Sequence, residues 1–182
     1  LSGWQARLAL PESCYQFSGT VTAVAFDPNS PERATVVGVS YRTQKESGNL
    51  VPGFGLVETE GYAIGLLHCN VGNNPEHDPY APCTVDDLRR VGIDYWALGH
   101  VHTRQVVSEY APVAVYPGNS QGRNPRETGP RGVYVVEAPA TGSPTLEFVE
   151  TSMVRWETAR IDIETVTSEQ ELLDAASGAA AR

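Results

Sequence analysis

Short runs of β-branched and aromatic residues, separated by turns rich in glycine and proline, predict that most of the chain forms strands. The segment from Cys14 to Val39 alternates between apolar and polar residues and predicts two or three strands, with a turn at Asp27 to Glu32. Further strands are expected at Tyr62–Leu67, Asp94–Leu98, Val106–Tyr110, Val113–Tyr116, Gly132–Glu137, Thr145–Val149 and Arg155–Ile163. The pattern favours a strand-rich fold over a helical bundle.

Two helices are expected among these strands. Thr84 is placed to cap the first helix, because Asp87 follows three residues later, and Gly92 is placed to end it. The pattern S-E-Q-E at Ser168–Glu171 predicts the start of a second helix in the same way. The first helix lies between two predicted strands at a spacing suited to one crossover between parallel strands. This arrangement indicates the α/β class.

Three of the four histidines directly follow predicted strands. His68 comes after the run Y-A-I-G-L-L, and His100 and His102 close the stretch D-Y-W-A-L-G-H-V-H. Sites in open α/β sheets collect at the carboxyl ends of strands, and imidazole is the commonest protein ligand for divalent transition metals. We therefore expect a metal site, although the histidine pair could instead be hydrogen-bonded or lie at the surface. The fourth histidine, His77, is expected to be an exposed loop residue.

Composition and motifs narrow the class of protein. The 182 residues, 41% of them hydrophobic, suffice for one globular domain with a core. A net charge of −9 argues against non-specific nucleic-acid binding but suits divalent cations. Three cysteines without a C-x-x-C pair favour a reducing compartment, and no apolar run reaches membrane-spanning length, so we expect a cytoplasmic protein without membrane association. No nucleotide-binding glycine motif occurs.

One loop concentrates positive charge in this acidic chain. Between Pro117 and Arg131 lie Asn119, Arg123, Arg126 and Arg131, which could contact a nucleic-acid backbone. The alternative is that these arginines are solvated or paired with a nearby acid such as Glu127.

Four stretches carry a resemblance to a known family. They are G-L-L-H-C-N-V-G at Gly65–Gly72, Y-A-P-C at Tyr80–Cys83, the stretch that ends in G-H-V-H, and Y-P-G-N-S-Q-G-R-N-P-R-E-T-G-P-R-G at Tyr116–Gly132. Over nearly its whole length the chain resembles the calcineurin-like metallophosphoesterases, in particular the DNA-repair exonuclease branch of SbcD-type nucleases. The resemblance implies that residues 1–153 form the C-terminal half of a four-layer α/β/β/α sandwich, and that residues 154–182 begin a capping domain.

The resemblance also implies a site with two divalent metal ions, usually manganese. His68 and His100 would bind one ion and His102 the other. The family's D-x-H motif, a second aspartate and an N-H motif do not occur here. The general acid is therefore expected upstream of Leu1, and the chain alone is expected to be inactive.

By the same resemblance, the intact protein would be a DNA exonuclease of double-strand-break repair, working as a homodimer with an SbcC-type coiled-coil ATPase. Trp156 beside Arg155 could anchor such an interface or pack into the core. Two other functions remain open: a phosphoesterase acting on a small phosphate ester or cyclic nucleotide, and a non-catalytic scaffold that docks a partner.

Overall fold

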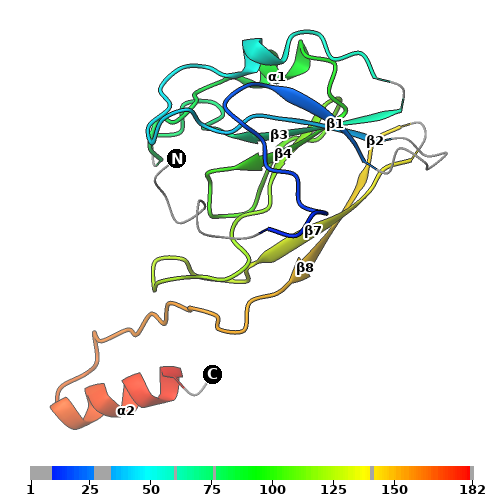
Figure 1. Ribbon diagram of the computed structural model, residues 1–182. Coiled ribbons are helices and arrows are strands. Elements are labelled where there is room, and N and C mark those ends of the chain that lie inside the picture. The colour runs from blue at the N-terminus through cyan, green and yellow to red at the C-terminus, as the bar shows by residue number, and fades with distance from the viewer. Residues whose placement is uncertain (1–9, 27–33, 60, 76, 140–141, 181–182) are drawn as a thin grey trace.

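The computed structural model describes residues 10–26, 34–59, 61–75, 77–139 and 142–180. Its larger sheet has six strands in the order β1-β2-β3-β4-β6-β5 (Figure 1). Their bounds are β1 (Thr22–Phe26), β2 (Ala34–Gly38), β3 (Tyr62–His68), β4 (Tyr95–Gly99), β5 (Gln105–Ser108) and β6 (Val113–Tyr116). These strands confirm the ones expected from the sequence in this part of the chain. The turn expected at 27–32 lies outside the described residues.

The centre of this sheet is parallel. Strands β2, β3, β4 and β6 run in one direction, and β1 and β5 pair antiparallel at the two edges. The helix α1 (Val85–Arg89) makes the crossover from β3 to β4, and the short helix η2 (Val51–Phe54) precedes β3. Because β3 and β4 are parallel neighbours, their carboxyl ends lie at the same edge of the sheet.

The N-terminus of α1 has the cap that the sequence predicts. The Thr84 hydroxyl accepts the backbone N–H of Asp87 at 3.1 Å, and the Asp87 carboxylate accepts the backbone N–H of Thr84 at 2.9 Å. These two bonds satisfy donors that the first turn of a helix cannot satisfy itself. Leu88 and Val91 are buried on the inner side, so the cap fixes where this apolar face meets the sheet.

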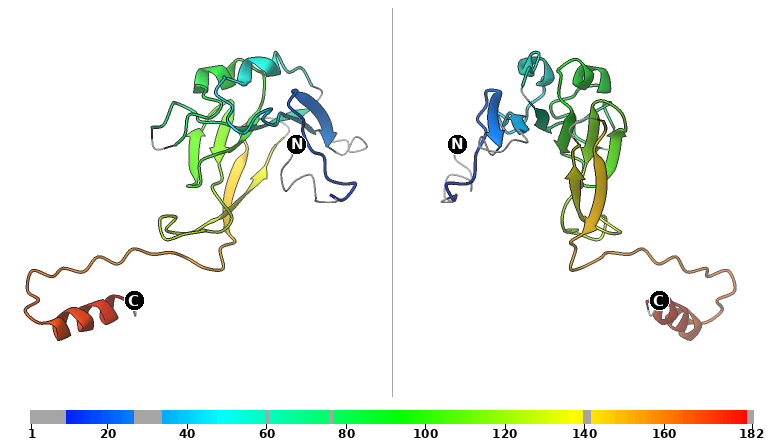
Figure 2. Two further views of the ribbon diagram at one scale, coloured as in Figure 1. Left: turned by 60° about the vertical axis from the view of Figure 1, so that its left-hand side comes forward. Right: turned by 90° about the vertical axis from the view of Figure 1, so that its right-hand side faces the viewer.

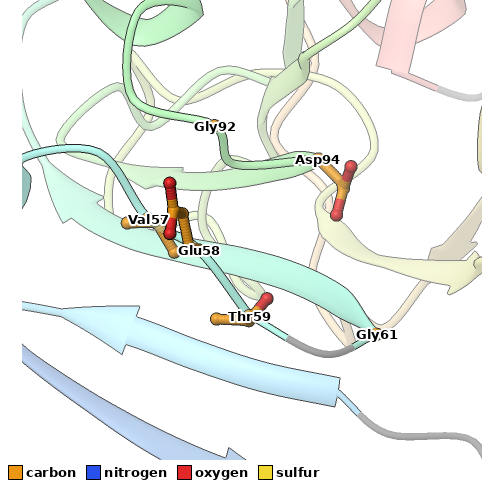
Figure 3. A pocket seen from close by; sticks show the side chains of 6 residues that line it. All are labelled: Val57, Glu58, Thr59, Gly61, Gly92 and Asp94. Atoms are coloured by element: carbon orange, nitrogen blue, oxygen red, sulfur yellow. The ribbon is translucent and has the colours of Figure 1, made fainter.

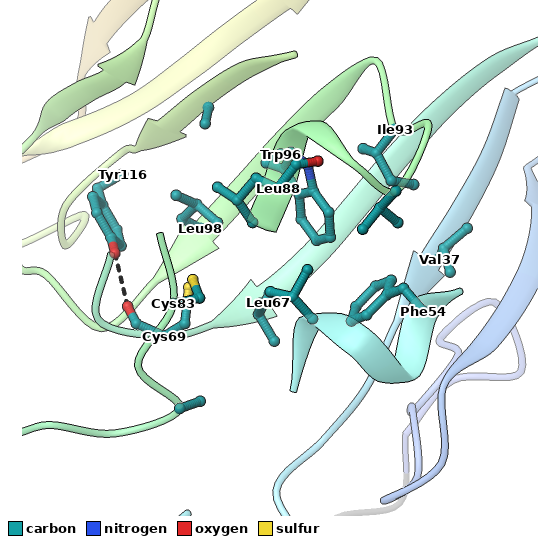
Figure 4. Close-up of a cluster of buried hydrophobic side chains, with 14 of the residues drawn as sticks. Val37, Phe54, Leu67, Cys69, Cys83, Leu88, Ile93, Trp96, Leu98 and Tyr116 are labelled. Carbon is teal, nitrogen blue, oxygen red and sulfur yellow. Dashed lines mark hydrogen bonds between the residues drawn. The ribbon is translucent and has the colours of Figure 1, made fainter. Parts of the chain in front are cut away.

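The main core lies between the six-stranded sheet and the two helices (Figure 4). Trp96 of β4 is fully buried at its centre, and its ring lies 5.0 Å from that of Phe54 in η2. The Trp96 indole N–H donates to the Leu88 carbonyl at 3.4 Å, which satisfies the polar edge of the ring.

A two-stranded sheet covers the opposite face. The strands β7 (Gly132–Glu137) and β8 (Thr145–Glu150) pair antiparallel, and their inner side chains pack against Tyr95, Val113 and Val115. The described residues thus form three layers: helices, a mixed sheet and a second sheet (Figure 1). This confirms the α/β class and agrees with part of the four-layer sandwich expected.

The chain after β8 differs from its prediction. The strand expected at Arg155–Ile163 is wrong: these residues are irregular, and the Trp156 carbonyl accepts the N–H of Gly129 in a loop instead of pairing with a strand. The second predicted helix is present as α2 (Glu169–Ala180), and Ser168 accepts the Glu171 N–H at its start. Figures 1 and 2 show α2 apart from both sheets at the end of an extended segment. No helix in the described ranges is long and apolar enough to cross a membrane.

Candidate metal centre

Two of the expected ligands are neighbours at the carboxyl edge of the sheet. His68 ends β3 and pairs in register with Gly99 at the end of β4, so the next residue, His100, lies beside it. The ring centroids of His68 and His100 are 5.2 Å apart, with an angle of 68° between the rings. The strand register therefore brings together two histidines that are 32 positions apart in the sequence.

The backbone turns sharply at His100. Its φ of 111° lies in a region that residues with a Cβ rarely adopt. The His100 Nε2 lies 2.9 Å from the carbonyl oxygen of Asp78. A carbonyl oxygen only accepts hydrogen bonds, so Nε2 carries the proton, and Nδ1 of His100 keeps a free lone pair.

The loop that presents the Asp78 carbonyl is held by a buried amide. Asn70 is 1% exposed, and its side chain donates to the carbonyls of Asn74 at 3.0 Å and Asp78 at 3.2 Å. Its side-chain oxygen accepts the Asn74 N–H at 2.9 Å. Asn70 therefore shapes the loop that fixes His100, a role that its polar neighbours in the sequence did not indicate.

Tyr116 fastens the chain just after His68. Its hydroxyl donates to the Cys69 carbonyl at 2.8 Å and accepts the Val71 N–H at 3.0 Å (Figure 4). On the other side, the Tyr41 hydroxyl donates to the His68 carbonyl at 2.6 Å. The main chain around His68 is thus held by two tyrosines, Tyr116 from β6 and Tyr41 from the loop after β2.

The expectation that His77 is a simple exposed loop residue is wrong. His77 is only partly exposed, and its ring centroid lies 5.7 Å from that of His100. The ring of Tyr80 lies 5.6 Å from His100 as well. His77 and Tyr80 therefore lie against His100 just after β4, a contact that the local polar composition did not indicate.

His102 lies in a different environment from the other two histidines. Its Nδ1 is 2.7 Å from the Oε1 of Glu127, and its side chain is 45% exposed. A guanidinium nitrogen of Arg123 is 3.1 Å from Nδ1 and 3.4 Å from Nε2, so this cation lies against the ring. The Arg123 side chain is nevertheless 67% exposed.

Electrostatics keep the first two rings neutral. Neighbouring atoms displace water from the His68 ring and lower its pKa, and positive charge on His100 or His102 would lower it further. Loss of water is also the largest cause that lowers the pKa of His100. Since an ordinary histidine has a pKa of about 6.5, both rings are neutral at pH 7 and retain a lone pair.

Glu127 belongs to the candidate site, although the sequence did not indicate a functional role for it. The backbone N–H of Arg123 is the main cause that lowers the pKa of Glu127 to about 2, and bonds from His102 and Asn119 lower it further. The carboxylate is therefore ionised at neutral pH. The sequence had suggested Glu127 only as a partner for loop arginines, and Arg123 does lie 3.7 Å from it.

The four residues proposed to contact nucleic acid are not equivalent. Arg123 and Arg126 are exposed, whereas Arg131 is 6% exposed and donates to the carbonyls of His102 and Thr128. Asn119 is partly buried and lies between Glu127 and Arg131. The structure gives Arg131 and Asn119 an internal role, whereas Arg126 is exposed and the exposed Arg123 contacts the His102 ring.

These residues fit a metal centre that is completed from elsewhere. His100 has one ring nitrogen held by a backbone oxygen and the other open, an arrangement typical of metal-binding histidines. His102 has its Nδ1 on a carboxylate, while a guanidinium nitrogen of Arg123 lies 3.4 Å from its Nε2. Within the described ranges, no three histidine, cysteine or acidic side chains converge closely enough to hold one ion. Further ligands are therefore needed for a closed site.

An open pocket of about 540 Å³ lies at the opposite edge of the sheet (Figure 3). It is lined by Glu58, Gly61, Asp94 and their neighbours, at the amino ends of β3 and β4. The Asp94 carboxylate accepts the Ala63 N–H at 2.8 Å and so is used to start β3. The pocket is separate from the histidines.

Comparison with known proteins gives one informative similarity. The chain is 37% identical over 164 residues to the uncharacterized metallophosphoesterase YhaO of Bacillus subtilis (strain 168). The match covers 90% of this chain but 40% of the length of YhaO. No protein-family model matches the chain. The similarity to YhaO, together with the histidines at the ends of β3 and β4, supports the metallophosphoesterase superfamily for this chain.

Proposed function

We propose that this chain is part of a metal-dependent phosphodiesterase, acting in the cytoplasm on DNA as an exonuclease. The observation that carries the proposal is the contact between His68 and His100, with ring centroids 5.2 Å apart at the carboxyl ends of adjacent parallel strands. Two neutral imidazoles meeting at such an edge suit a divalent transition metal.

In this proposal His68 and His100 hold one ion and His102 holds the other. A pair of divalent ions, when bound, supplies an activated water and neutralises charge that develops on phosphate oxygens. Neutral imidazoles leave more positive charge on such ions than carboxylates would, which favours a phosphate substrate. The Asp78 carbonyl orients His100 through a hydrogen bond to its Nε2. The Glu127 carboxylate orients His102 through a hydrogen bond to its Nδ1.

The exposed arginines beside His102 support a nucleic-acid substrate. Arg123 lies against the His102 ring and Arg126 follows in the same exposed loop. A guanidinium pairs well with a phosphate oxygen, so these side chains would meet the DNA backbone next to the metals. Arg126→Ala should weaken DNA binding about equally for all sequences and reduce the salt dependence by about one ion.

Substitution of the histidines tests the metal assignment. In the longer protein that contains this chain, His68→Ala and His102→Ala should each abolish manganese-dependent hydrolysis of duplex DNA while the thermal unfolding midpoint stays close to that of the wild type. His77→Ala, which changes a ring next to His100 but no proposed ligand, is the matched control. Turnover at the wild-type rate in either ligand variant would contradict the assignment.

A small phosphate ester or cyclic nucleotide is the second candidate substrate. The net charge of −9 favours it, because a polyanion is repelled by an acidic surface. Rates on duplex DNA, a cyclic nucleotide and a model phosphodiester, measured side by side, separate the two. Hydrolysis of the small substrates with no cleavage of DNA would favour the second candidate.

The proposal extends to partners. We propose a homodimer that works with a coiled-coil ATPase, with residues 154–182 beginning the region that senses DNA. Trp156 donates its indole N–H to the Gly122 carbonyl at 3.3 Å, so it packs on the loop that contains the exposed arginines. Removing residues 155–182 should impair processing of duplex DNA but spare hydrolysis of a small phosphodiester. Equal loss on both substrates would contradict this role.

A further inference from the structure

The Glu127 carboxylate is surrounded by hydrogen-bond donors. His102 Nδ1 is 2.7 Å from Oε1, whereas the Asn119 amide at 2.9 Å and the Arg123 backbone N–H at 2.7 Å both donate to Oε2. The Asn119 amide nitrogen and the Arg123 backbone N–H can only donate, and an ionised carboxylate can only accept. The proton between His102 and Glu127 therefore sits on Nδ1 of the ring, and Nε2 keeps its lone pair, which lies 3.4 Å from a guanidinium nitrogen of the exposed Arg123.

We propose that Glu127 is a positioning residue that holds His102 in the Nδ1–H tautomer and turns its Nε2 lone pair toward the metal site. The metal part of this inference rests on the proposed function. The tautomer does not, because it follows from the hydrogen bonds of this chain alone. Carboxylates that accept the second ring N–H of a ligating histidine fix its orientation in many metal sites.

The hydrogen bonds of Arg131 and Asn119 hold both His102 and Glu127 in place. Arg131, which is buried, donates to the His102 carbonyl, to Asn119 Oδ1 at 3.2 Å and to the Thr128 carbonyl at 2.8 Å. The Asn119 N–H also donates to the His102 carbonyl, at 3.1 Å. Ring and carboxylate are thus tied to one another through the backbone as well as directly, so they keep their relative position.

Gly118 makes this close approach possible. Its φ is 81°, and a Cβ at this position would lie 2.7 Å from the His102 carbonyl oxygen. A side chain there would both strain the backbone and push the loop away from His102. The glycine of the Y-P-G stretch therefore belongs to the device that positions His102.

The variant Glu127→Gln distinguishes a role of Glu127 in positioning His102 from a role in stabilising the loop alone. A glutamine side chain has one acceptor and one donor end, whereas two donors already occupy the Oε2 side. If the amide oxygen keeps those two donors, its NH2 group faces His102 Nδ1. That nitrogen must then accept, and the proton moves to Nε2. We expect Glu127→Gln to reverse the tautomer of His102, an outcome that a loosened loop alone would not produce.

Long-range 1H–15N NMR spectra of the metal-free chain, labelled with 15N-histidine, test this directly. Spectra are recorded over a pH series, and the tautomer is read where the 15N chemical shifts show a neutral ring. The wild type should show His102 protonated at Nδ1, and Glu127→Gln should show it protonated at Nε2. Glu147→Gln, at an exposed glutamate on β8, is the matched control and should leave all four histidines unchanged.

Three results would overturn the inference: an Nε2–H tautomer in the wild type, an equal mixture of both, or an unchanged tautomer in folded Glu127→Gln. If Glu127→Gln does not fold, the inference is tested with the wild type and Glu127→Asp. The shorter aspartate carboxylate still only accepts hydrogen bonds, so His102 should keep its proton on Nδ1. In the longer protein, Glu127→Gln should weaken manganese binding about 10- to 100-fold. The expected tautomer without any metal-dependent hydrolysis would remove the proposed function and leave the positioning role intact.

Discussion

Gly99 lies directly against the ring of His68. The two residues are register partners at the ends of β4 and β3, and a Cβ on Gly99 would come within 2.9 Å of the His68 Nδ1. The glycine before the pair of histidines thus provides space for the third histidine, which belongs to a different strand. In the sequence, this glycine directly follows the strand expected at Asp94–Leu98.

Gly99→Ala should displace the His68 ring. A side-chain ring can rotate away, so we expect a small change in the unfolding midpoint but a loss of metal-dependent turnover of about 100-fold, as misplacement of about 1 Å can cause. Steady-state kinetics of the longer protein and thermal unfolding measure the two effects. Gly48→Ala, at an exposed loop glycine with no atom closer than 3.7 Å, is the control. Turnover at the wild-type rate in Gly99→Ala would contradict this placement of the ring.

The positive φ of His100 gives a second prediction. At φ 111° a residue with a Cβ is strained by about 1–3 kcal/mol, whereas glycine is not. His100→Gly should therefore be more stable than His100→Ala, although both lack the imidazole. Chemical denaturation of both variants measures the difference. Equal stability would mean that the surrounding loop relaxes and the strain is not stored at this position.

Gly65 and Trp96 provide a test of the core. They are register partners on β3 and β4, and a Cβ on Gly65 would lie 2.6 Å from Cζ3 of the Trp96 ring. Because Trp96 is fully buried and cannot move aside, we expect Gly65→Ala to cost about 1–3 kcal/mol of unfolding free energy. Gly178→Ala in α2, where no atom lies within 4 Å, should leave the main unfolding transition unchanged. A neutral Gly65→Ala would contradict the packing.

The cap of α1 predicts a pH dependence. The backbone N–H of Thr84 is the main cause that lowers the pKa of Asp87 in the folded chain. Its stabilisation is therefore present above the unfolded pKa of about 3.9 and is lost as the pH falls through the lower, folded pKa. Asp87→Asn should cost about 1 kcal/mol at pH 7, and the difference from wild type should shrink below about pH 4. Thermal unfolding from pH 7 to 3 measures it, with Glu137→Gln as control. A constant difference would refute this account.

Much of the sheet could be predicted because its signals are local. Alternating apolar residues and flanking turns place β3, β4 and β6 to within a residue, and Thr84 with Asp87 marks the start of α1. The closeness of His68 and His100 could be predicted from one inference, that the strands before them are parallel neighbours.

The supporting contacts could not be predicted in the same way. Glu127 contacts His102, which lies 25 residues earlier in the sequence. Glu127 belongs to a polar loop whose composition resembles that of any solvated turn. His77 reaches His100 only because Asn70 folds the intervening loop back. The segment Arg155–Ile163 alternates like a strand, but its Trp156 carbonyl accepts the Gly129 N–H, and the preceding Val154 carbonyl accepts from the Gln121 side chain, so neither bonds to a sheet edge. In each case, distant backbone partners decide the outcome.

Those last bonds have a mechanical consequence. Gln121 binds the backbone of Met153 and Val154, and the Gly129 N–H donates to the Trp156 carbonyl at 2.9 Å, so the departing chain is fastened on both sides of Glu127. A load applied to the C-terminal segment reaches this loop before it reaches either sheet. The C-terminal segment is therefore attached first to the loop that holds Glu127, the partner of His102, and not to the strands β3 and β4 that lead to His68 and His100.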